Sequence, residues 1–178
     1  KESFNSLNND KYYNNLRDRA FSLLKINTDY SIEIMNNAKF FQASNYNDYN
    51  GNITRDYKNI NHELINDEIF KKLILSFKSN SEKDLKSPIN YIYVHQIRVY
   101  AEDGKETNLI PEGIHKDGYN IVGMVCINRK NIVGGINGIY NNIKKKVHDV
   151  QLEEGDLLII NDNKMYHDVT NIKKIEEN

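Results

Sequence analysis

The sequence has one cysteine and no tryptophan, and only two of its 178 residues are proline. The single cysteine, Cys126, cannot form a disulfide within the chain, which favours a reducing compartment. No secretory signal is recognisable in the sequence. We therefore expect a cytoplasmic protein.

Neither sign of charge prevails, because 24 Lys and Arg face 25 Asp and Glu. With a net charge of -1 the chain lacks the basic surplus of nucleic-acid-binding proteins, so no nucleic-acid partner is expected. Long apolar runs are lacking too. The stretches at 121–127 and 157–160 are far too short to span a bilayer, so no membrane partner is expected. The length suits one domain, and nothing in the sequence indicates an oligomeric state.

Apolar residues at helical spacing occur in two segments. The spacing predicts one helix over residues 11–26 and a second over residues 67–78, the latter capped by Asn66. The apolar positions that recur every three or four residues are Tyr13, Leu16, Ala20, Leu23 and Leu24, then Leu64, Ile65, Ile69, Leu73, Ile74 and Phe77.

The rest of the chain is rich in β-branched and aromatic residues between turn signals. Gly, Asn or Asp mark turns at 102–104, 131–135, 153–155 and 161–163. The predicted strands cover residues 38–44, 89–101, 119–128, 136–140, 147–152, 156–160 and 164–170. Helices followed by short strands predict an α+β fold in which a sandwich or barrel of antiparallel strands carries the function.

His115 and Asp117 stand two positions apart and are the first candidate metal ligands. In an extended segment their side chains point to one face. His167 follows in another predicted strand, which a β-sandwich can bring alongside. Two His and one carboxylate on one face of an octahedral metal leave three positions open, the arrangement of non-haem iron(II) oxygenases.

His-x-Asp alone is a weak motif, and its ordinary interpretation is a pair of solvated loop residues. The chain has five His. We expect His62 and His148 on the surface, and His95 hydrogen-bonded within a strand. On the residues alone, a non-catalytic β-barrel that binds a small ligand or a structural metal stays open as an alternative.

Longer blocks surround these candidates. They read HQIRV at 95–99, PEGIHKDG at 111–118, INRKNIVGG at 127–135 and HDVT at 167–170. Upstream, RDRAFSLL at 17–24 and FQAS at 41–44 precede them. In this order they resemble the bacterial 2-oxoglutarate/iron(II) dioxygenases that hydroxylate free L-amino acids, the group containing the L-isoleucine 4-hydroxylases. The resemblance covers nearly the whole chain, and the segment at 17–24 resembles the first helix of that family.

The resemblance implies that His115, Asp117 and His167 bind Fe(II). It implies a single dioxygenase domain over residues 1–178. N-terminal helices within about 1–88 would pack on a double-stranded β-helix, a jelly-roll or cupin-like core, at about 89–178. The co-substrates would be 2-oxoglutarate and O2, and succinate and carbon dioxide would be released. The substrate would be a small molecule, a free L-amino acid, and a dioxygenase acting on a protein or peptide side chain is the further alternative.

One departure concerns the distal carboxylate of 2-oxoglutarate. The family usually binds this group with an Arg on a strand after the second His, but the sequence ends eight residues after Thr170, with only Lys173 and Lys174 there. Either the protein continues into a further C-terminal strand, or another basic residue replaces that Arg. We expect Arg98 and Gln96, which share one strand face, to bind 2-oxoglutarate. A structural salt bridge is the alternative for Arg98.

Arg129 matches a family position in the block at 127–135. We expect its task to be structural. The glycines at the end of this block favour a turn with positive φ and need no catalytic role.

Overall fold

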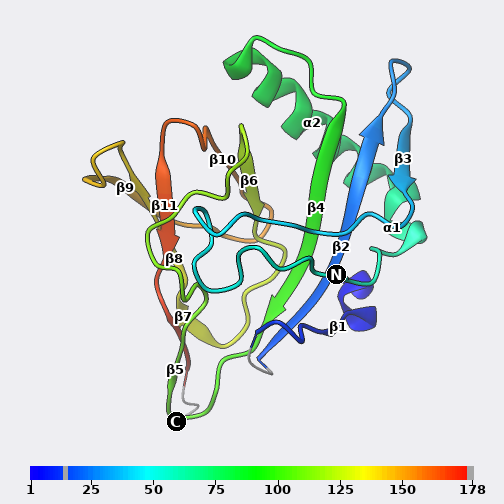
Figure 1. Ribbon diagram of the computed structural model, residues 1–178. Coiled ribbons are helices and arrows are strands. Elements are labelled where there is room, and N and C mark those ends of the chain that lie inside the picture. Colours follow the sequence, from blue (N-terminus) through cyan, green and yellow to red (C-terminus); the bar gives the residue numbers. More distant parts are fainter. Residues whose placement is uncertain (14–15, 176–178) are drawn as a thin grey trace. The chain divides into compact units, whose positions relative to one another are not determined.

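The structure is a computed structural model that describes residues 1–13 and 16–175 (Figure 1). Contacts divide the chain into two compact units, the first Lys1–Phe40 with Thr54–Arg98 and the second Phe41–Ile53 with Val99–Asn178. Short antiparallel strands prevail over few helices, which confirms the predicted α+β class. The single domain and the double-stranded β-helix stay predictions.

The first unit is built around one long strand, β2. It pairs with β1, β3 and β4, and β2 and β4 are the long arrows that run side by side in Figure 1. The elements are η1 (Glu2–Ser6), β1 (Asn8–Asn9), β2 (Arg17–Ile26), β3 (Ile32–Met35), α1 (His62–Asn66), α2 (Glu68–Leu85) and β4 (Tyr91–Val99).

Apolar side chains of α1 and α2 form a core with β2 and β4. Leu24 of β2 is fully buried, and Ile65, Ile74 and Ile92 contribute from α1, α2 and β4. Asp67 begins α2 by accepting a hydrogen bond from the Phe70 N–H. The helix predicted over 67–78 is therefore confirmed, although it ends only at Leu85. The predicted cap is wrong, because Asp67 caps α2 and Asn66 is the last residue of α1.

The helix predicted over residues 11–26 is wrong. Residues 17–26 form strand β2, and residues 14–15 of that prediction lie outside the described part of the chain. The physical reason is burial on both faces, since most side chains of β2 are buried regardless of position. A strand covered on both sides has no alternation of apolar and polar residues, so its leucines can match a helical period by accident. The N-terminal part is thus not helical throughout.

The second unit consists of short antiparallel pairings. Strand β8 lies between β11 and β9, β6 pairs with β10, and β12 lies between β5 and β7. The bounds are β5 (Glu106–Thr107), β6 (Val122–Val125), β7 (Ile132–Gly134), β8 (Ile136–Tyr140), β9 (Lys146–Gln151), β10 (Leu157–Ile160), β11 (Tyr166–Val169) and β12 (Ile172–Lys174).

The strands predicted between residues 89 and 170 are confirmed as β4, β6, β8, β9, β10 and β11, with clearly shorter bounds for β4, β6 and β11. The strand predicted over 38–44 is wrong. Only an isolated bridge between Phe40 and Arg55 forms there. Turns at 44–46 and 48–52 follow, so the segment has no neighbour to pair with along its length.

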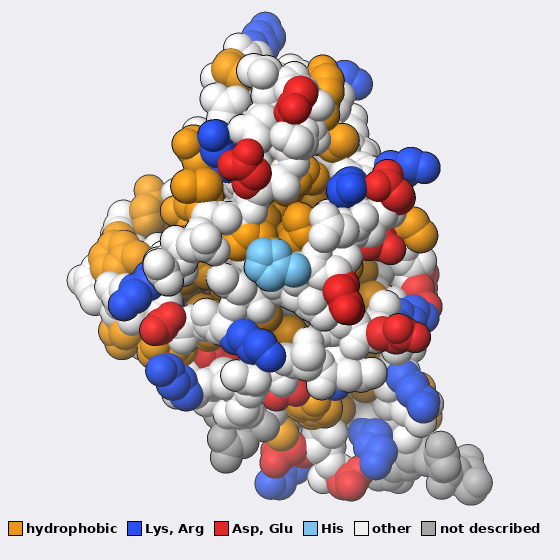
Figure 2. Space-filling model, turned by 90° about the vertical axis from the view of Figure 1, so that its right-hand side faces the viewer, with side chains coloured by type: hydrophobic (Ala, Val, Ile, Leu, Met, Phe, Trp, Pro, Cys, Tyr) orange, Lys and Arg blue, Asp and Glu red, His pale blue; other side chains and the backbone are white. Residues whose placement is uncertain are grey.

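Charged side chains of both signs lie interspersed on the face drawn in Figure 2, where no extended patch of one sign gathers among the described residues. No helix within residues 1–13 and 16–175 is long and apolar enough to cross a membrane.

Candidate metal centre

The backbones of His115 and His167 pair directly with each other. Each donates its N–H to the carbonyl of the other at 3.0 Å, which makes an isolated antiparallel bridge. Residues opposite each other in such a pair carry their side chains on the same face. The two imidazoles accordingly lie next to each other, with ring centroids 4.4 Å apart.

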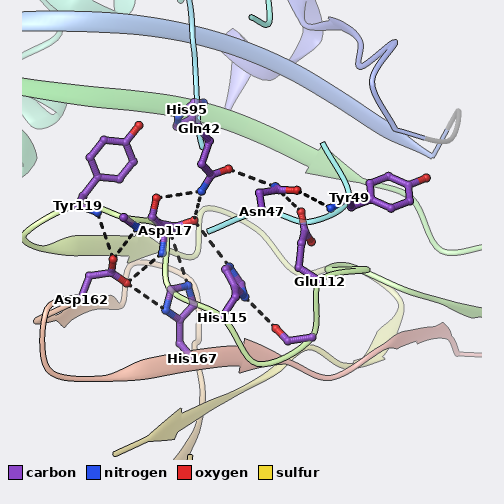
Figure 3. A network of polar contacts seen from close by, with 12 residues as sticks. Gln42, Asn47, Tyr49, His95, Glu112, His115, Asp117, Tyr119, Asp162 and His167 are labelled. Atoms are coloured by element: carbon purple, nitrogen blue, oxygen red, sulfur yellow. Dashed lines mark hydrogen bonds and ion pairs between the residues drawn. The ribbon is translucent and has the colours of Figure 1, made fainter. Parts of the chain in front are cut away.

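Asp117 completes the group from the same segment as His115. Its Oδ1 lies 3.7 Å from His115 Nε2 and its Oδ2 lies 3.5 Å from His167 Nε2, so the carboxylate faces both imidazoles (Figure 3). One ligand atom from each of the three residues lies within 4.8 Å of the other two. The structure thus brings together the three residues that the sequence predicted as ligands.

Asp162 holds the backbone that carries Asp117. Its carboxylate, only 1% exposed, accepts hydrogen bonds from the N–H groups of Asp117, Gly118 and Tyr119 at 3.1, 2.8 and 3.2 Å. A buried carboxylate with several N–H donors is a stable anchor because its charge is satisfied. The same carboxylate lies 3.8 Å from His167 Nδ1.

A chain of amides contacts Asp117 from the segment 42–47. Gln42 Nε2 donates to the carbonyl oxygen of Asp117 at 2.9 Å and to its Oδ1 at 3.3 Å. Asn47 Nδ2 in turn donates to Gln42 Oε1 at 3.2 Å and to Glu112 Oε1 at 2.6 Å. Figure 3 shows this row leading from Glu112 to the carboxylate of Asp117. The hydrogen bond from Gln42, which Asn47 holds in place, therefore helps to orient the carboxylate of Asp117.

The contacts among His115, Asp117 and His167 shift the pKa values of Asp117 and His115. Burial alone would raise the pKa of Asp117, but the hydrogen bonds and charges of His115 and His167 hold it well below its ordinary value. Burial would lower the pKa of His115, and here the hydrogen bond and charge of Asp117 outweigh it, so the net shift is upward. Asp117 is therefore an anion at neutral pH, and its negative charge favours the binding of a cation.

The donor set fits a divalent metal. The Nδ1 of His115 lies 2.8 Å from the Gly113 carbonyl, which leaves Nε2 for a metal. His167 Nδ1 is buried without a hydrogen bond among the described residues, and the Asp162 carboxylate stands where the N–H of a metal-bound His usually finds an acceptor. One donor atom of each residue lies within 4.8 Å of the others, so His115, Asp117 and His167 would together hold a divalent ion.

Comparisons with known proteins identify the family of the chain. The model of the family described as 2OG-Fe dioxygenase matches residues 1–178. The chain belongs to the 2OG-Fe dioxygenase family. Its cofactor and co-substrates are accordingly Fe(II), 2-oxoglutarate and O2. An L-isoleucine-4-hydroxylase from Bacillus thuringiensis is 26% identical over 168 residues, which cover 90% of this chain and 69% of that protein.

Two solved structures share the fold of this dioxygenase. A bsmA homologue from Methylobium petroleophilum PM1 superposes with a TM-score of 0.85 at 22% identity, over 98% of this chain and 72% of the other. IDO from Bacillus thuringiensis superposes with a TM-score of 0.71 at 21% identity, over 97% of this chain and 72% of the other. At these identities the likeness describes the fold alone.

Gln96 and Arg98, which we expect to bind 2-oxoglutarate, lie on β4 in the first unit of the dioxygenase. Gln96 is buried and donates to Ser3 Oγ at 2.9 Å, and Arg98 Nη2 donates to Asn5 Oδ1 at 3.3 Å. The three candidate metal ligands, which we call the metal group, are His115, Asp117 and His167, and they lie in the second unit. Their role toward 2-oxoglutarate stays a prediction.

Sequence reasoning did not find the anchoring roles of Asp162 and Gln42. Asp162 lay in a predicted turn, and Gln42 lay in the FQAS block that carried the resemblance. Asp162 lies 45 positions from Asp117 and Gln42 lies 75 positions from it, so local sequence patterns do not indicate these contacts. The FQAS block was the one feature of the sequence that drew attention to Gln42.

Proposed function

We propose that His115, Asp117 and His167 bind the catalytic iron(II), and that this dioxygenase hydroxylates a free L-amino acid. The spacing of the three donors carries the ligand assignment. Two imidazole Nε2 atoms face the two oxygens of one carboxylate at 3.7 and 3.5 Å. Two His and a carboxylate are the ligand set of the facial triad of non-haem iron(II) oxygenases.

The three residues contribute different properties to the binding of the ion. His115 and His167 contribute neutral nitrogen donors, and Asp117 contributes the negative charge that retains a divalent cation. An iron(II) ion held by these three residues on one face would keep further positions open for its co-substrates. When bound, iron(II) with its co-substrates would supply the oxidation, in which one atom of O2 enters a C–H bond of the substrate and the other enters succinate, with release of carbon dioxide. Asp162 and Gln42 keep Asp117 in the orientation that this binding needs.

The substrate part of the proposal is supported by the relative from Bacillus thuringiensis, which is an L-isoleucine-4-hydroxylase. The net charge of -1 also favours a small neutral substrate over nucleic acid.

The test is an assay of succinate formation from 2-oxoglutarate, with iron(II), ascorbate and each of the twenty amino acids in turn. Products are analysed by mass for the gain of one oxygen atom. We expect at least one free amino acid to gain oxygen with an equal amount of succinate. If a peptide gains oxygen and no free amino acid does, the amino-acid part is wrong and the enzyme acts on a protein side chain.

A matched pair of histidine variants tests the ligand assignment. His115→Ala removes a proposed ligand, whereas His148→Ala removes an exposed histidine of β9 in the same unit. Binding of Mn(II), measured by calorimetry without oxygen, is expected to be lost in His115→Ala and kept in His148→Ala. Retained binding in His115→Ala contradicts the assignment. A protein that binds metal through His115 but forms no succinate with any substrate is a non-catalytic metal-binding barrel.

A further inference from the structure

A pocket in the second unit combines apolar walls with one cation. It has a volume of about 210 Å³ and is lined by Val125, Ile132, Val169 and Ile172 together with Arg129 and Asn137, among others. An apolar cavity of about 150 Å³ binds benzene, so this one has room for a short-chain molecule. One guanidinium in an apolar pocket favours a ligand with an apolar middle and an anionic end.

The strand register places this pocket beside the metal group. His167 and Val169 are two positions apart on β11, so their side chains share a face. On the neighbouring β8, Ile139 is the partner of His167 and Asn137 is the partner of Val169. The pocket residues Asn137 and Val169 therefore lie one side-chain pair along from His167, a step of about 7 Å. The carbon chain of 2-oxoglutarate covers a similar length from its 2-oxo acid end to its distal carboxylate.

The guanidinium of Arg129 is held in place by the paired glycines. Its Nη2 donates to the Gly134 carbonyl at 2.6 Å. A Cβ on Gly135 would lie only 3.1 Å from Arg129 Nη1, so the absence of a side chain there lets the guanidinium approach. Arginine has five N–H donors, and the hydrogen bond to Gly134 engages one of them. A guanidinium fixed in this way binds a carboxylate with little further loss of conformational entropy.

We propose that Arg129 binds the distal carboxylate of 2-oxoglutarate in this pocket, in place of Arg98. This inference rests on the proposed iron ligands, because it sets the other end of the co-substrate at His115, Asp117 and His167. It replaces the structural task expected for Arg129 with a binding task, while the hydrogen bond to Gly134 orients the side chain.

The first test compares two ligands on the Mn(II)-loaded protein without oxygen. 2-Oxopentanoate has the same chain and 2-oxo acid end as 2-oxoglutarate but lacks the distal carboxylate. Charge-assisted hydrogen bonds to that carboxylate are expected to make 2-oxoglutarate bind the wild-type protein about 10- to 100-fold more tightly, as measured by calorimetry. In Arg129→Gln we expect the two ligands to bind alike, since only the recognition of the distal carboxylate is lost.

Two control variants decide between the candidate residues. Lys130→Gln removes the exposed cation next to Arg129 and is expected to keep the preference for 2-oxoglutarate. Arg98→Gln is also expected to keep it. The inference is overturned if Arg129→Gln retains the preference, or if Arg98→Gln abolishes it. Mn(II) binding is measured separately in every variant, so a failure of the iron-ligand assignment is recognised independently.

A second measurement needs no variant and applies even if Arg129→Gln does not fold. Cys126 lines the same pocket and is the only cysteine of the chain. Burial raises the pKa of its thiol, so alkylation by iodoacetamide is followed at mildly alkaline pH. Saturating 2-oxoglutarate with Mn(II) is expected to slow alkylation of Cys126 at least several-fold. An unchanged rate, at a concentration where calorimetry shows saturation, places the co-substrate elsewhere and contradicts the inference.

Discussion

The buried carboxylate of Asp162 accepts a hydrogen bond from the backbone N–H of Asp117 at 3.1 Å. Together with the N–H groups of Gly118 and Tyr119, this contact fixes the loop that presents Asp117 to the two imidazoles. Residues that orient metal ligands in this way are often nearly as sensitive to substitution as the ligands themselves.

Asp162→Asn replaces one acceptor oxygen with an amide that points a donor at backbone donors. We expect Mn(II) affinity to fall about 10- to 100-fold. The free energy of unfolding of the metal-free protein should fall by about 1–3 kcal/mol, because a buried N–H loses its acceptor. Calorimetry and urea unfolding measure the two effects. The control is Asp149→Asn, which changes a half-exposed partner of Lys146 in the same unit and should alter neither quantity appreciably.

Gln42 contacts the metal group from the other side, through its amide nitrogen and the carboxylate of Asp117. Gln42→Leu keeps the approximate size of the side chain and removes the donor. We expect a loss of about 10-fold or more in Mn(II) affinity, because Asp117 is then free to rotate away from the imidazoles. Asn52→Leu, at an exposed position of the same segment, is the control for a general disturbance of residues 41–53. Equal losses in both variants would argue against a specific role of Gln42.

The three residues that we propose as metal ligands could be predicted because they combine a short-range pattern with long blocks around it. His115 and Asp117 stand at the spacing that an extended segment converts into one face, and the blocks at 111–118 and 167–170 distinguished them from chance His-x-Asp pairs. The three side chains meet once the segments of His115 and His167 pair, and the bridge between these two residues provides that pairing.

The parts that escaped prediction depend on packing rather than on local sequence. Leu23 and Leu24 of β2 suggested a helix because a strand buried on both faces does not alternate. Gln42 and Asp162 are ordinary polar residues in turn-like segments, and only the folded chain brings them to Asp117. Local periodicity carries no information on such long-range contacts.

Helix α2 offers a pair of isoleucines that differ in burial. Ile74 is 6% exposed within the core of the first unit, whereas Ile69 is 78% exposed on the same helix. Ile74→Ala should lower the free energy of unfolding by about 2–5 kcal/mol, because it leaves a cavity beside β2 and β4. Ile69→Ala should change it by no more than about 0.5 kcal/mol. Denaturant unfolding of both variants measures the difference, and similar values for the two would contradict the packing of α2.

Glu82, near the end of α2, gives this unit a dependence on pH. The hydrogen bond from Lys78 and then the hydrogen bond from the Ile89 N–H, at 2.7 Å, lower the pKa of Glu82. A carboxyl group whose pKa is lower in the folded than in the unfolded state stabilises the fold above its unfolded pKa of about 4.3. That contribution disappears as the pH falls through the folded pKa.

Glu82→Gln should therefore be less stable than the wild-type protein at pH 7, and the two should converge as the pH is lowered below about 4. Thermal unfolding across this pH range measures the convergence. Glu68→Gln, at the exposed start of the same helix, gives the baseline for the loss of one surface carboxylate. A difference between Glu82→Gln and wild type that stays constant from pH 7 to pH 3 would mean that the charge of Glu82 contributes nothing.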